Sequence, residues 1–391
     1  MADVGAPSST TERGERWAST MDGFVVRPSP GIAVVTAHSD SSVTLSQPTL
    51  DGFDHGVDRA IREAREDQLL AAVATRSIGA GKRLRPEEPD SWRTCFERDR
   101  DRILHAAAFR RLSGKTQVFV FPNDHQRTRL THALEVAQVA SSIARALGLN
   151  VALAEAIALG HDCGHGPGGH ASEDAFNPFI PGGFDHATWG ADVSLASLNL
   201  CEETLDGIRN HSWSRPAPTT PEGEVVSWAD RIAYVCHDFE DAASAGIVAA
   251  DRLPESVATQ CGTRRGDQLG SFIDAMVTTT LQSGRVGMDL AHAEALADFR
   301  SFNYEHIYLR DASTAQASAV IEVLTALVEH FADAPNTIPG VVEAGGLLSG
   351  ESDATIAAVT YVAGMTDRFA FRSAVSLLDF DPDRLPQGID G

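Results

Sequence analysis

Histidine and aspartate side chains are spaced along the chain in a way that could assemble a metal site. His132, the adjacent pair His161-Asp162 and Asp230 would together supply two imidazoles and two carboxylates. Such side chains can converge on one cation when they project from facing helices of a bundle. Without a thiolate, this set suits Mg²⁺, Mn²⁺ or Fe²⁺ better than a structural zinc ion. The alternative is a group of core histidines with ordinary partners, and the residues alone leave both interpretations open.

Four more ionisable residues follow His161 closely enough to act on a substrate held at such a site. A glycine-rich loop can bring His165 and His170 back to the metal, and Glu173 would orient His170 if a helix starts there. His186 would be a further acid. The alternative role for these histidines is to order the loop that contains them.

Helices must position these residues, because apolar residues recur at helical spacing after the first fifty positions. Apolar residues three or four apart over 130–147 predict a helix with a buried face. Gly148 and Asn150 then supply a helix stop and a new N-cap. A second helix is predicted over about 151–161, and it ends at the His-Asp pair.

The segment after that pair has a different composition. Residues 163–190 contain seven glycines and three prolines, which predicts an active-site loop region rather than regular helix. Asp230 falls in a third predicted helix, and no alternating series predicts a strand. The predicted fold class is therefore all-α. Further helices are predicted near 190–209, 222–245, 267–283, 289–300, 313–333 and 353–376.

Composition and charge restrict the possible classes of protein. The chain has 391 residues, 43% hydrophobic residues and a formal charge of −22. It can bury a large core, and its acidity argues against bulk nucleic-acid binding. The exception is the segment 82–129, which contains twelve basic and seven acidic residues. Either this segment binds an anionic substrate or it is a solvated, ion-paired helix.

Localisation and domain organisation follow from simpler features. No apolar run is long enough to span a membrane, and the N-terminus lacks a secretion signal. Five scattered cysteines without CxxC spacing indicate reduced thiols and a cytoplasmic protein. Residues 1–50, rich in Ser, Thr, Pro and Gly, are predicted to be a disordered leader, and 51–391 one all-α domain.

Several separate segments resemble the bacterial deoxyguanosinetriphosphate triphosphohydrolase-like proteins, which are HD-domain phosphohydrolases. The resemblance extends in the same order from about 95 to 376. The chain departs from the usual family pattern at Cys163, Gly166 and Gly168, and these three changes leave the histidine spacing intact. The segments that carry the resemblance are RDRDRILH (98–105), FRRLSGKTQV (109–118), RTRLTH (127–132), HDCGHGPGGH (161–170), ADRIAY (229–234), HDFED (237–241) and AGMTDR (363–368).

The resemblance implies an HD core at about 125–245 inside a multi-helix phosphohydrolase bundle, and a homo-oligomer. It implies that the metal ligands are His132, His161, Asp162 and Asp230. It also implies that the four ionisable residues after the His-Asp pair activate water, protonate the leaving group and contact the phosphates. These four residues are His165, His170, Glu173 and His186.

Phosphate-binding candidates have the positive charge that a triphosphate requires. Arg129 lies one helical turn before His132 and should point to the same side; by resemblance it holds a phosphate near the reacting centre. Arg111 and Lys115 are weaker candidates in the loop after the first basic helix. Arg231 is the weakest, because a turn of about 100° per residue points it away from its neighbour Asp230.

The third helix has a polar face beyond its metal ligand. At about 100° per residue, Tyr234, His237 and Asp241 lie within a narrow arc of Asp230, and Asp238 lies close to that arc. By resemblance, Tyr234 occupies the region that a ribose 2′-OH would need. Asp238 would accept a hydrogen bond from the 3′-OH.

The predicted function is metal-dependent hydrolysis of deoxynucleoside triphosphates to deoxynucleoside and tripolyphosphate. Mg²⁺ or Mn²⁺ is the expected metal, with Fe²⁺ a further option, and dGTP is the preferred substrate by resemblance alone. One alternative is another HD phosphohydrolase reaction, on a nucleotide monophosphate or a cyclic dinucleotide. A second alternative is a non-catalytic protein whose HD site only binds a nucleotide.

Overall fold

The computed structural model describes residues 12, 14–15, 25–29, 32–38, 40, 56–123, 125–342 and 344–387. The chain divides into two compact units, Met1–Val57 and Asp58–Gly391. The helices of the second unit are α2 (Arg59–Leu69), α3 (Cys95–His105), α4 (Ala107–Arg111), α5 (Arg129–Leu147), α6 (Val151–Gly160), α7 (Ala171–Phe176), α8 (His186–Trp189), α9 (Glu202–Arg209), α10 (Pro221–Ser244), α11 (Glu255–Cys261), α12 (Arg265–Ser283), α13 (Leu290–Asn303), α14 (Asp311–Asp333), α15 (Ser352–Ala363) and α16 (Asp367–Leu378).

The first unit contains an element that the sequence analysis did not predict. Strand β1 (Val25–Ser29) pairs antiparallel with β2 (Ile32–Thr36), with Val26 opposite Val35. The Pro-Gly dipeptide between the two segments is a turn signal that the prediction of a leader without structure overlooked. Most of that predicted leader lies outside the described residues.

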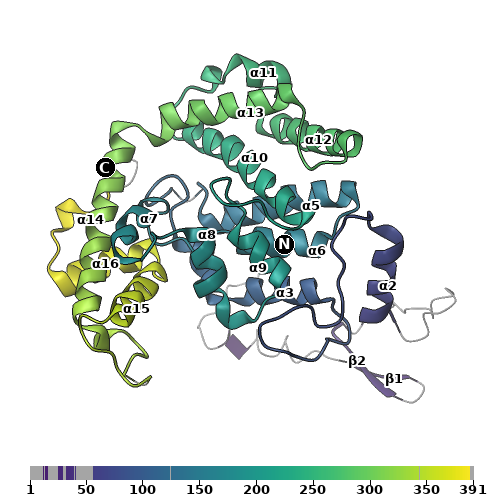
Figure 1. The fold of residues 1–391 in the computed structure, drawn as a ribbon, viewed down its shortest axis with the longest axis horizontal. Helices are drawn as coiled ribbons and strands as arrows, with labels where there is room; N and C mark the ends of the chain where they lie inside the picture. Colours follow the sequence, from purple (N-terminus) through teal and green to yellow (C-terminus); the bar gives the residue numbers. More distant parts are fainter. Residues whose placement is uncertain are drawn as a thin grey trace, which may run out of the picture. The chain divides into compact units, whose positions relative to one another are not determined.

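The second unit is helical, which confirms the all-α fold class. Helices α5, α6 and α10 pack against one another, and Figure 1 shows them together in the middle of this unit. Their apolar faces meet those of α3 and α13 in a large core that includes Ile103, Val136, Ile143, Ile157 and Phe299. Burying such side chains stabilises the bundle by about 1.5–3 kcal/mol each.

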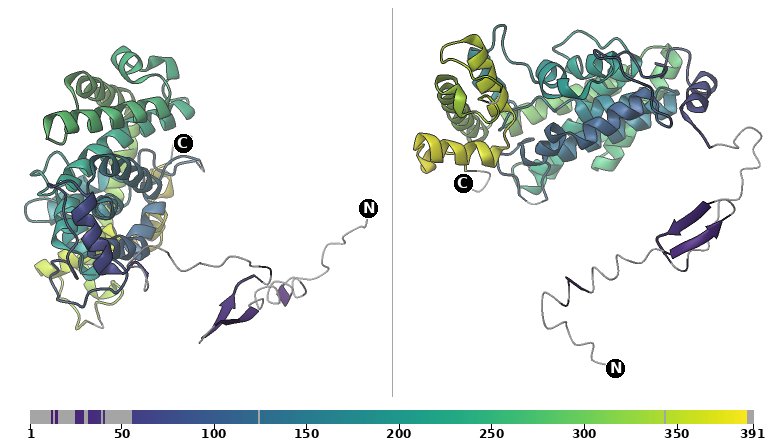
Figure 2. Two further views of the ribbon diagram at one scale, coloured as in Figure 1. Left: turned by 90° about the vertical axis from the view of Figure 1, so that its right-hand side faces the viewer. Right: turned by 90° about the horizontal axis from the view of Figure 1, so that it is seen from below.

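A second hydrophobic core lies around α14. Helices α7, α15 and α16 pack on α14 through Phe176, Val320, Val359 and Phe371, among others. Figure 2 shows the yellow and yellow-green helices α14–α16 grouped at one end of this unit. Two cores therefore flank the loop region that the sequence assigns to the site.

Helix boundaries near the site follow their capping residues. Helix α5 ends at Gly148, whose φ of 67° is the left-handed conformation that glycine adopts without strain. The Asn150 side chain then accepts a hydrogen bond from the N–H of Leu153 and starts α6. Both boundaries confirm the predicted helices.

Other predicted helices are interrupted. The segment predicted as a helix over 190–209 is a π-helical turn at Gly190–Ser194, a 3₁₀ turn at Ala196–Leu198 and then α9. The segment 353–376 is the two helices α15 and α16, separated at Gly364–Thr366. The predicted loop region contains the short helices α7 and α8. Among the described residues, no helix has both the length and the apolarity that a membrane crossing requires.

Candidate active site

The four predicted metal ligands come together at the junction of three helices. His132 projects from α5, His161 and Asp162 directly follow α6, and Asp230 projects from α10. His132 Nε2 and His161 Nε2 lie 3.0 and 3.7 Å from the same oxygen, Asp230 Oδ1. His161 Nε2 is also 3.4 Å from Asp162 Oδ1.

The donor atoms of this cluster fit a divalent cation. His161 Nδ1 lies 2.6 Å from the carbonyl oxygen of Ala158, so this nitrogen carries the ring proton. The other nitrogen, Nε2, is buried without a hydrogen-bond partner and presents its lone pair to the carboxylates. His132, His161 and Asp230 have ligand atoms within 4.8 Å of one another, as a shared ion requires.

The electrostatics of the cluster keep both carboxylates charged. Burial opposes ionisation of Asp162, but Arg129 and the neighbouring histidines hold its pKa well below the usual range. Burial likewise opposes ionisation of Asp230, whose pKa is lowered by the hydrogen bond with His132 and by the neighbouring imidazole of His161. Two charged carboxylates in a buried site favour an added cation.

The four predicted acid–base residues form a second group beside the first. Glu173, on α7, places Oε1 3.3 Å from His170 Nδ1 and 2.7 Å from His186 Nδ1. His165 Nδ1 is 3.8 Å from the same oxygen, and its Nε2 is 3.2 Å from Asp162 Oδ1. The glycine-rich loop therefore brings His165 beside Asp162, one of the predicted ligands, whereas His170 contacts Glu173 and the ring of His165.

The group separates its histidines by charge. Burial opposes protonation of His186, but Glu173 raises its pKa. Burial, together with the charges of Arg129 and His186, lowers the pKa of His165 well below the usual range. There is therefore a pH range in which His165 is neutral and His186 is protonated. Of the three rings, that of His170 is the exposed one, at 76%.

His211 is a site residue that the sequence analysis missed. Its Nδ1 lies 2.8 Å from the carbonyl oxygen of Ile208, and its Nε2 is 3.3 Å from His186 Nε2. It forms a third group of potential ligands with His161 and Asp162. Burial, followed by the electrostatic effect of the neighbouring His161 imidazole, lowers its pKa to about 4, so it is a neutral ligand or acceptor. Its only sequence signal was its residue type, because no recognised motif surrounds it.

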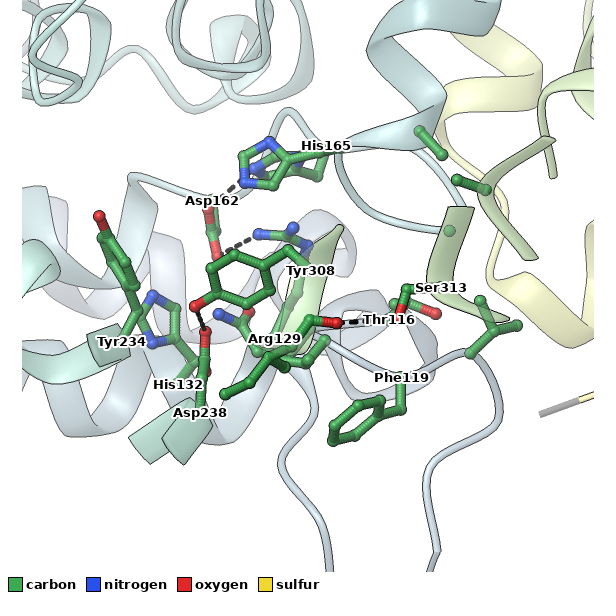
Figure 3. A pocket seen from close by; sticks show the side chains of 18 of the residues that line it. Thr116, Phe119, Arg129, His132, Asp162, His165, Tyr234, Asp238, Tyr308 and Ser313 are labelled. Atoms are coloured by element: carbon green, nitrogen blue, oxygen red, sulfur yellow. Dashed lines mark hydrogen bonds and ion pairs between the residues drawn. The ribbon is translucent and has the colours of Figure 1, made fainter. Parts of the chain in front are cut away.

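A cavity of about 660 Å³ opens on both groups of residues. Arg129 lines it as predicted, donating from Nη1 to Asp162 Oδ2 at 2.8 Å, while its Nε and Nη2 are buried without a partner (Figure 3). At another wall, the Tyr308 hydroxyl donates to Asp238 Oδ2 at 2.5 Å. Burial raises the pKa of Asp238 to about 7, against the opposing effect of that hydrogen bond.

Two more arginines line the cavity. The guanidinium of Arg231 lies 3.3 Å from the ring centre of Trp213, and that of Arg300 lies 4.3 Å from the ring centre of Tyr304. Arg300 Nε also donates to the Tyr234 hydroxyl at 3.0 Å. Neither arginine forms an ion pair with a described acidic residue. Arg231 was the weakest predicted phosphate-binding candidate, because it points away from Asp230 around the helix. Its long side chain nevertheless reaches the cavity, which the direction around the helix could not predict.

The structure does not bring Arg111 and Lys115 to this cavity. The Lys115 amine is buried and donates to the carbonyl oxygens of His165 and Ala363, at 2.9 Å for Ala363. Burial, with a contribution from Arg111, lowers the Lys115 pKa to about 7. Arg111 lies at a separate cavity beside the α15–α16 turn. These positions give no support to phosphate contacts by either residue.

Gly164 is the most closely packed glycine of the glycine-rich loop, residues 163–170, and alanine there should destabilise the fold. An added Cβ would overlap the carbonyl oxygen of His186 and the nitrogen of Gly190, which are backbone atoms. We expect Gly164→Ala to cost more than the roughly 1–3 kcal/mol of ordinary overpacking. Gly270→Ala is the control, because a Cβ there meets nothing within 4 Å. Equal urea midpoints for the two variants would contradict this close packing.

Comparison with known proteins identifies the family. Residues 129–235 match the HD domain, and residues 286–375 match the phosphohydrolase-associated domain. A deoxyguanosinetriphosphate triphosphohydrolase-like protein of Caldanaerobacter subterraneus subsp. tengcongensis is 40% identical over 319 residues, covering 80% of this chain and 93% of the relative. A protein of the same name from Clostridium perfringens strain 13 is 40% identical over 320 residues, covering 77% and 90%. The chain therefore belongs to the deoxyguanosinetriphosphate triphosphohydrolase-like family of HD-domain phosphohydrolases.

Proposed function

We propose that this phosphohydrolase cleaves deoxynucleoside triphosphates, with dGTP preferred, into deoxynucleoside and tripolyphosphate. The observation that carries the proposal is the cavity, which is lined by residues of the proposed metal site, by arginines without an acidic partner and by buried acceptor oxygens. A metal bound by His132, His161, Asp162 and Asp230 would polarise a phosphoryl oxygen and lower the pKa of a bound water. We propose Mg²⁺ or Mn²⁺, with Fe²⁺ also compatible with these ligands.

The phosphate end of the substrate matches the charge of the cavity wall. The Nε and Nη2 of Arg129 are buried without a hydrogen-bond partner, and we propose that this guanidinium binds the α-phosphate beside the metal ligands. Arg231 and Arg300 also line the cavity and form no ion pair with a described acidic residue, so a polyphosphate chain would neutralise them. This extended positive wall favours a triphosphate over a monophosphate.

The sugar end matches the acceptor atoms that the cavity leaves unpaired. Asp238 Oδ1 and Gln117 Oε1 are buried, line the cavity and have no hydrogen-bond partner. A buried acceptor without a partner costs free energy that a substrate hydroxyl would recover. We propose that the deoxyribose 3′-OH donates to Asp238, and that the rings of Tyr234 and Tyr308 restrict the space around C2′.

The acid–base group acts next to the α-phosphate. Protonated His186, held by Glu173, and the exposed ring of His170 can donate a proton to the leaving 5′-oxygen. Neutral His165 can hold or orient the attacking water through its position beside Asp162.

The five buried free cysteines support a reducing compartment, and we propose a cytoplasmic homo-oligomer.

The decisive experiment is product analysis with the four dNTPs and GTP, each with Mg²⁺ and with Mn²⁺. Tripolyphosphate released from a dNTP is the expected result. Orthophosphate released from a monophosphate, or cleavage of a cyclic dinucleotide, would favour the other HD reactions. Nucleotide binding without metal-dependent turnover would favour a sensor.

Sugar selectivity provides a prediction within this function. Asp238→Ala should weaken the binding of dGTP by about 0.5–3 kcal/mol, the range from a neutral hydrogen bond to one with a charged group, and should lose discrimination against 2′,3′-dideoxy-GTP. Tyr234→Ala and Tyr308→Ala should narrow the preference for dGTP over GTP, chiefly by admitting GTP. The measurement is kcat/KM for dGTP, GTP and 2′,3′-dideoxy-GTP.

Tyr308→Phe separates the two possible functions of Tyr308. It keeps the ring that would exclude a 2′-OH and removes only the hydroxyl that donates to Asp238. It should therefore keep the dGTP:GTP ratio while changing the affinity for dGTP. If all of these variants leave both substrate ratios at the parent values, this wall does not contact the sugar.

A further inference from the structure

We propose that Asp367 and Lys115 are positioning residues, through which the C-terminal helices hold residues 163–170, the proposed catalytic loop, in the conformation that the reaction needs. The kinetic part of this inference rests on the proposed function, whereas the structural part does not. Both residues lie outside the substrate cavity, and both are buried between the two hydrophobic cores. Each contacts the loop that carries His165 and His170.

Asp367, the first residue of α16, joins two segments distant in sequence. Its Oδ2 accepts hydrogen bonds from the N–H and hydroxyl of Thr116, at 2.9 and 2.6 Å. Its Oδ1 accepts a hydrogen bond from the N–H of Gly168, in the catalytic loop, at 2.9 Å. A buried carboxylate with three donors is a strong link, because hydrogen bonds to a charged group are stronger than neutral ones.

Lys115 makes the complementary link through carbonyl oxygens. Its amine donates to the carbonyl oxygen of His165 in the loop and to that of Ala363 at the end of α15. The lysine and the aspartate thus connect the same loop to the same helix pair, the lysine through the carbonyl oxygen of His165 and the aspartate through the N–H of Gly168. Among the described residues, Lys115 and Asp367 form no ion pair with each other, and most of their hydrogen bonds are to main-chain groups.

The loop needs such external support, because its own conformation is demanding. Gly168 has a φ of 73°, and an added Cβ there would overlap Val320 of α14. The loop therefore contacts the second core at Gly168 and the metal ligands at His165 within a few residues. A small displacement of this loop moves His165 and His170 relative to the α-phosphate, and a misplacement of about 1 Å can cost roughly 10²-fold in rate.

Asp367→Asn tests the link in the metal-loaded full-length protein. The amide retains one oxygen for the two donors of Thr116 and turns its NH₂ toward the N–H of Gly168, which breaks the loop contact. We expect faster hydrogen–deuterium exchange in the peptide 163–170 and a kcat for dGTP lower by about 10²-fold. KM and metal content should stay at the parent values.

Glu222→Gln is the matched control. Glu222 is also fully buried and also accepts two main-chain N–H groups and a threonine hydroxyl, from Thr75 and Asn150. It has no contact with the catalytic loop. Its loss should lower the unfolding midpoint while leaving loop exchange and the kcat of metal-loaded enzyme unchanged.

The outcomes separate positioning from mere stability. Unchanged hydrogen–deuterium exchange at 163–170 in Asp367→Asn overturns the proposal. A kcat of Asp367→Asn that falls only in proportion to lost metal, so that the metal-loaded enzyme keeps the parent rate, overturns it as well. Lys115→Met tests the contact with the carbonyl oxygen of His165, and it should likewise speed hydrogen–deuterium exchange in the peptide 163–170. If neither variant folds, the two residues are structural and the proposal fails. If the parent protein does not cleave dNTPs, the proposed function fails, while the exchange data still decide the loop contact.

Discussion

Replacing Asp162 by alanine is expected to abolish both hydrolysis and metal retention. Asp162 Oδ1 faces His161 and His165, at 3.4 and 3.2 Å, and its Oδ2 accepts a hydrogen bond from Arg129. The substitution removes a charged ligand and also leaves the arginine buried and unpaired. The loss of activity should exceed the roughly 10–100-fold cost of removing a partner that only orients a ligand.

The same variant should lower stability, because breaking a buried ion pair costs about 3–5 kcal/mol. Metal content by elemental analysis, the unfolding midpoint and the dNTP turnover rate are the measurements. Asp192→Ala is the control, since Asp192 forms only a half-exposed ion pair with Arg209. Near-parental hydrolysis by Asp162→Ala with metal bound would show that the ligand assignment is wrong.

The sequence predicted the elements whose signals are local. Helices α5 and α6 were predicted with their boundaries, because Gly148 and Asn150 end one helix and start the next through local conformational preferences. The positions of His132 and Asp230 followed from the same helical periodicity. Their convergence at one point was one of two interpretations that the residues left open, and the family resemblance favoured it.

The sequence could not predict contacts that depend on tertiary packing. Tyr308 reaches Asp238 from a π-helical turn after α13, and no local pattern links these two residues. Lys115 has the residue type of a phosphate ligand, but its burial turns the amine toward carbonyl groups instead. The break between α15 and α16 was missed because apolar periodicity continues across Gly364–Thr366.

Glu173 connects the two histidines that are candidates for the general acid, and its removal should change the pH dependence of the reaction. Its Oε1 lies 2.7 Å from His186 Nδ1 and 3.3 Å from His170 Nδ1. Burial alone would lower the pKa of His186, and the carboxylate raises it instead. A histidine with a raised pKa keeps its proton to a higher pH than an unperturbed histidine, and it loses the proton as the pH rises through that pKa.

Glu173→Gln should therefore lower the pKa of His186 and move the basic limb of the kcat profile to lower pH. Asp174→Asn, at the exposed neighbouring position, is the control and should leave the profile unchanged. A parental profile in Glu173→Gln would show that His186 is not the proton donor whose titration limits the rate at high pH.

His170→Ala should keep the metal and lose about 10²–10⁴-fold in kcat, the usual contribution of a general acid–base group. The double variant with Glu173→Gln distinguishes the two histidines, because residues that act as one unit are not additive. If Glu173 acts through His170, the double variant should be no slower than His170→Ala alone. If Glu173 acts through His186, the two losses should add, and the shifted basic limb should persist in the double variant. Loss of metal in His170→Ala would make this histidine a ligand, and unchanged kcat would restrict it to ordering the loop.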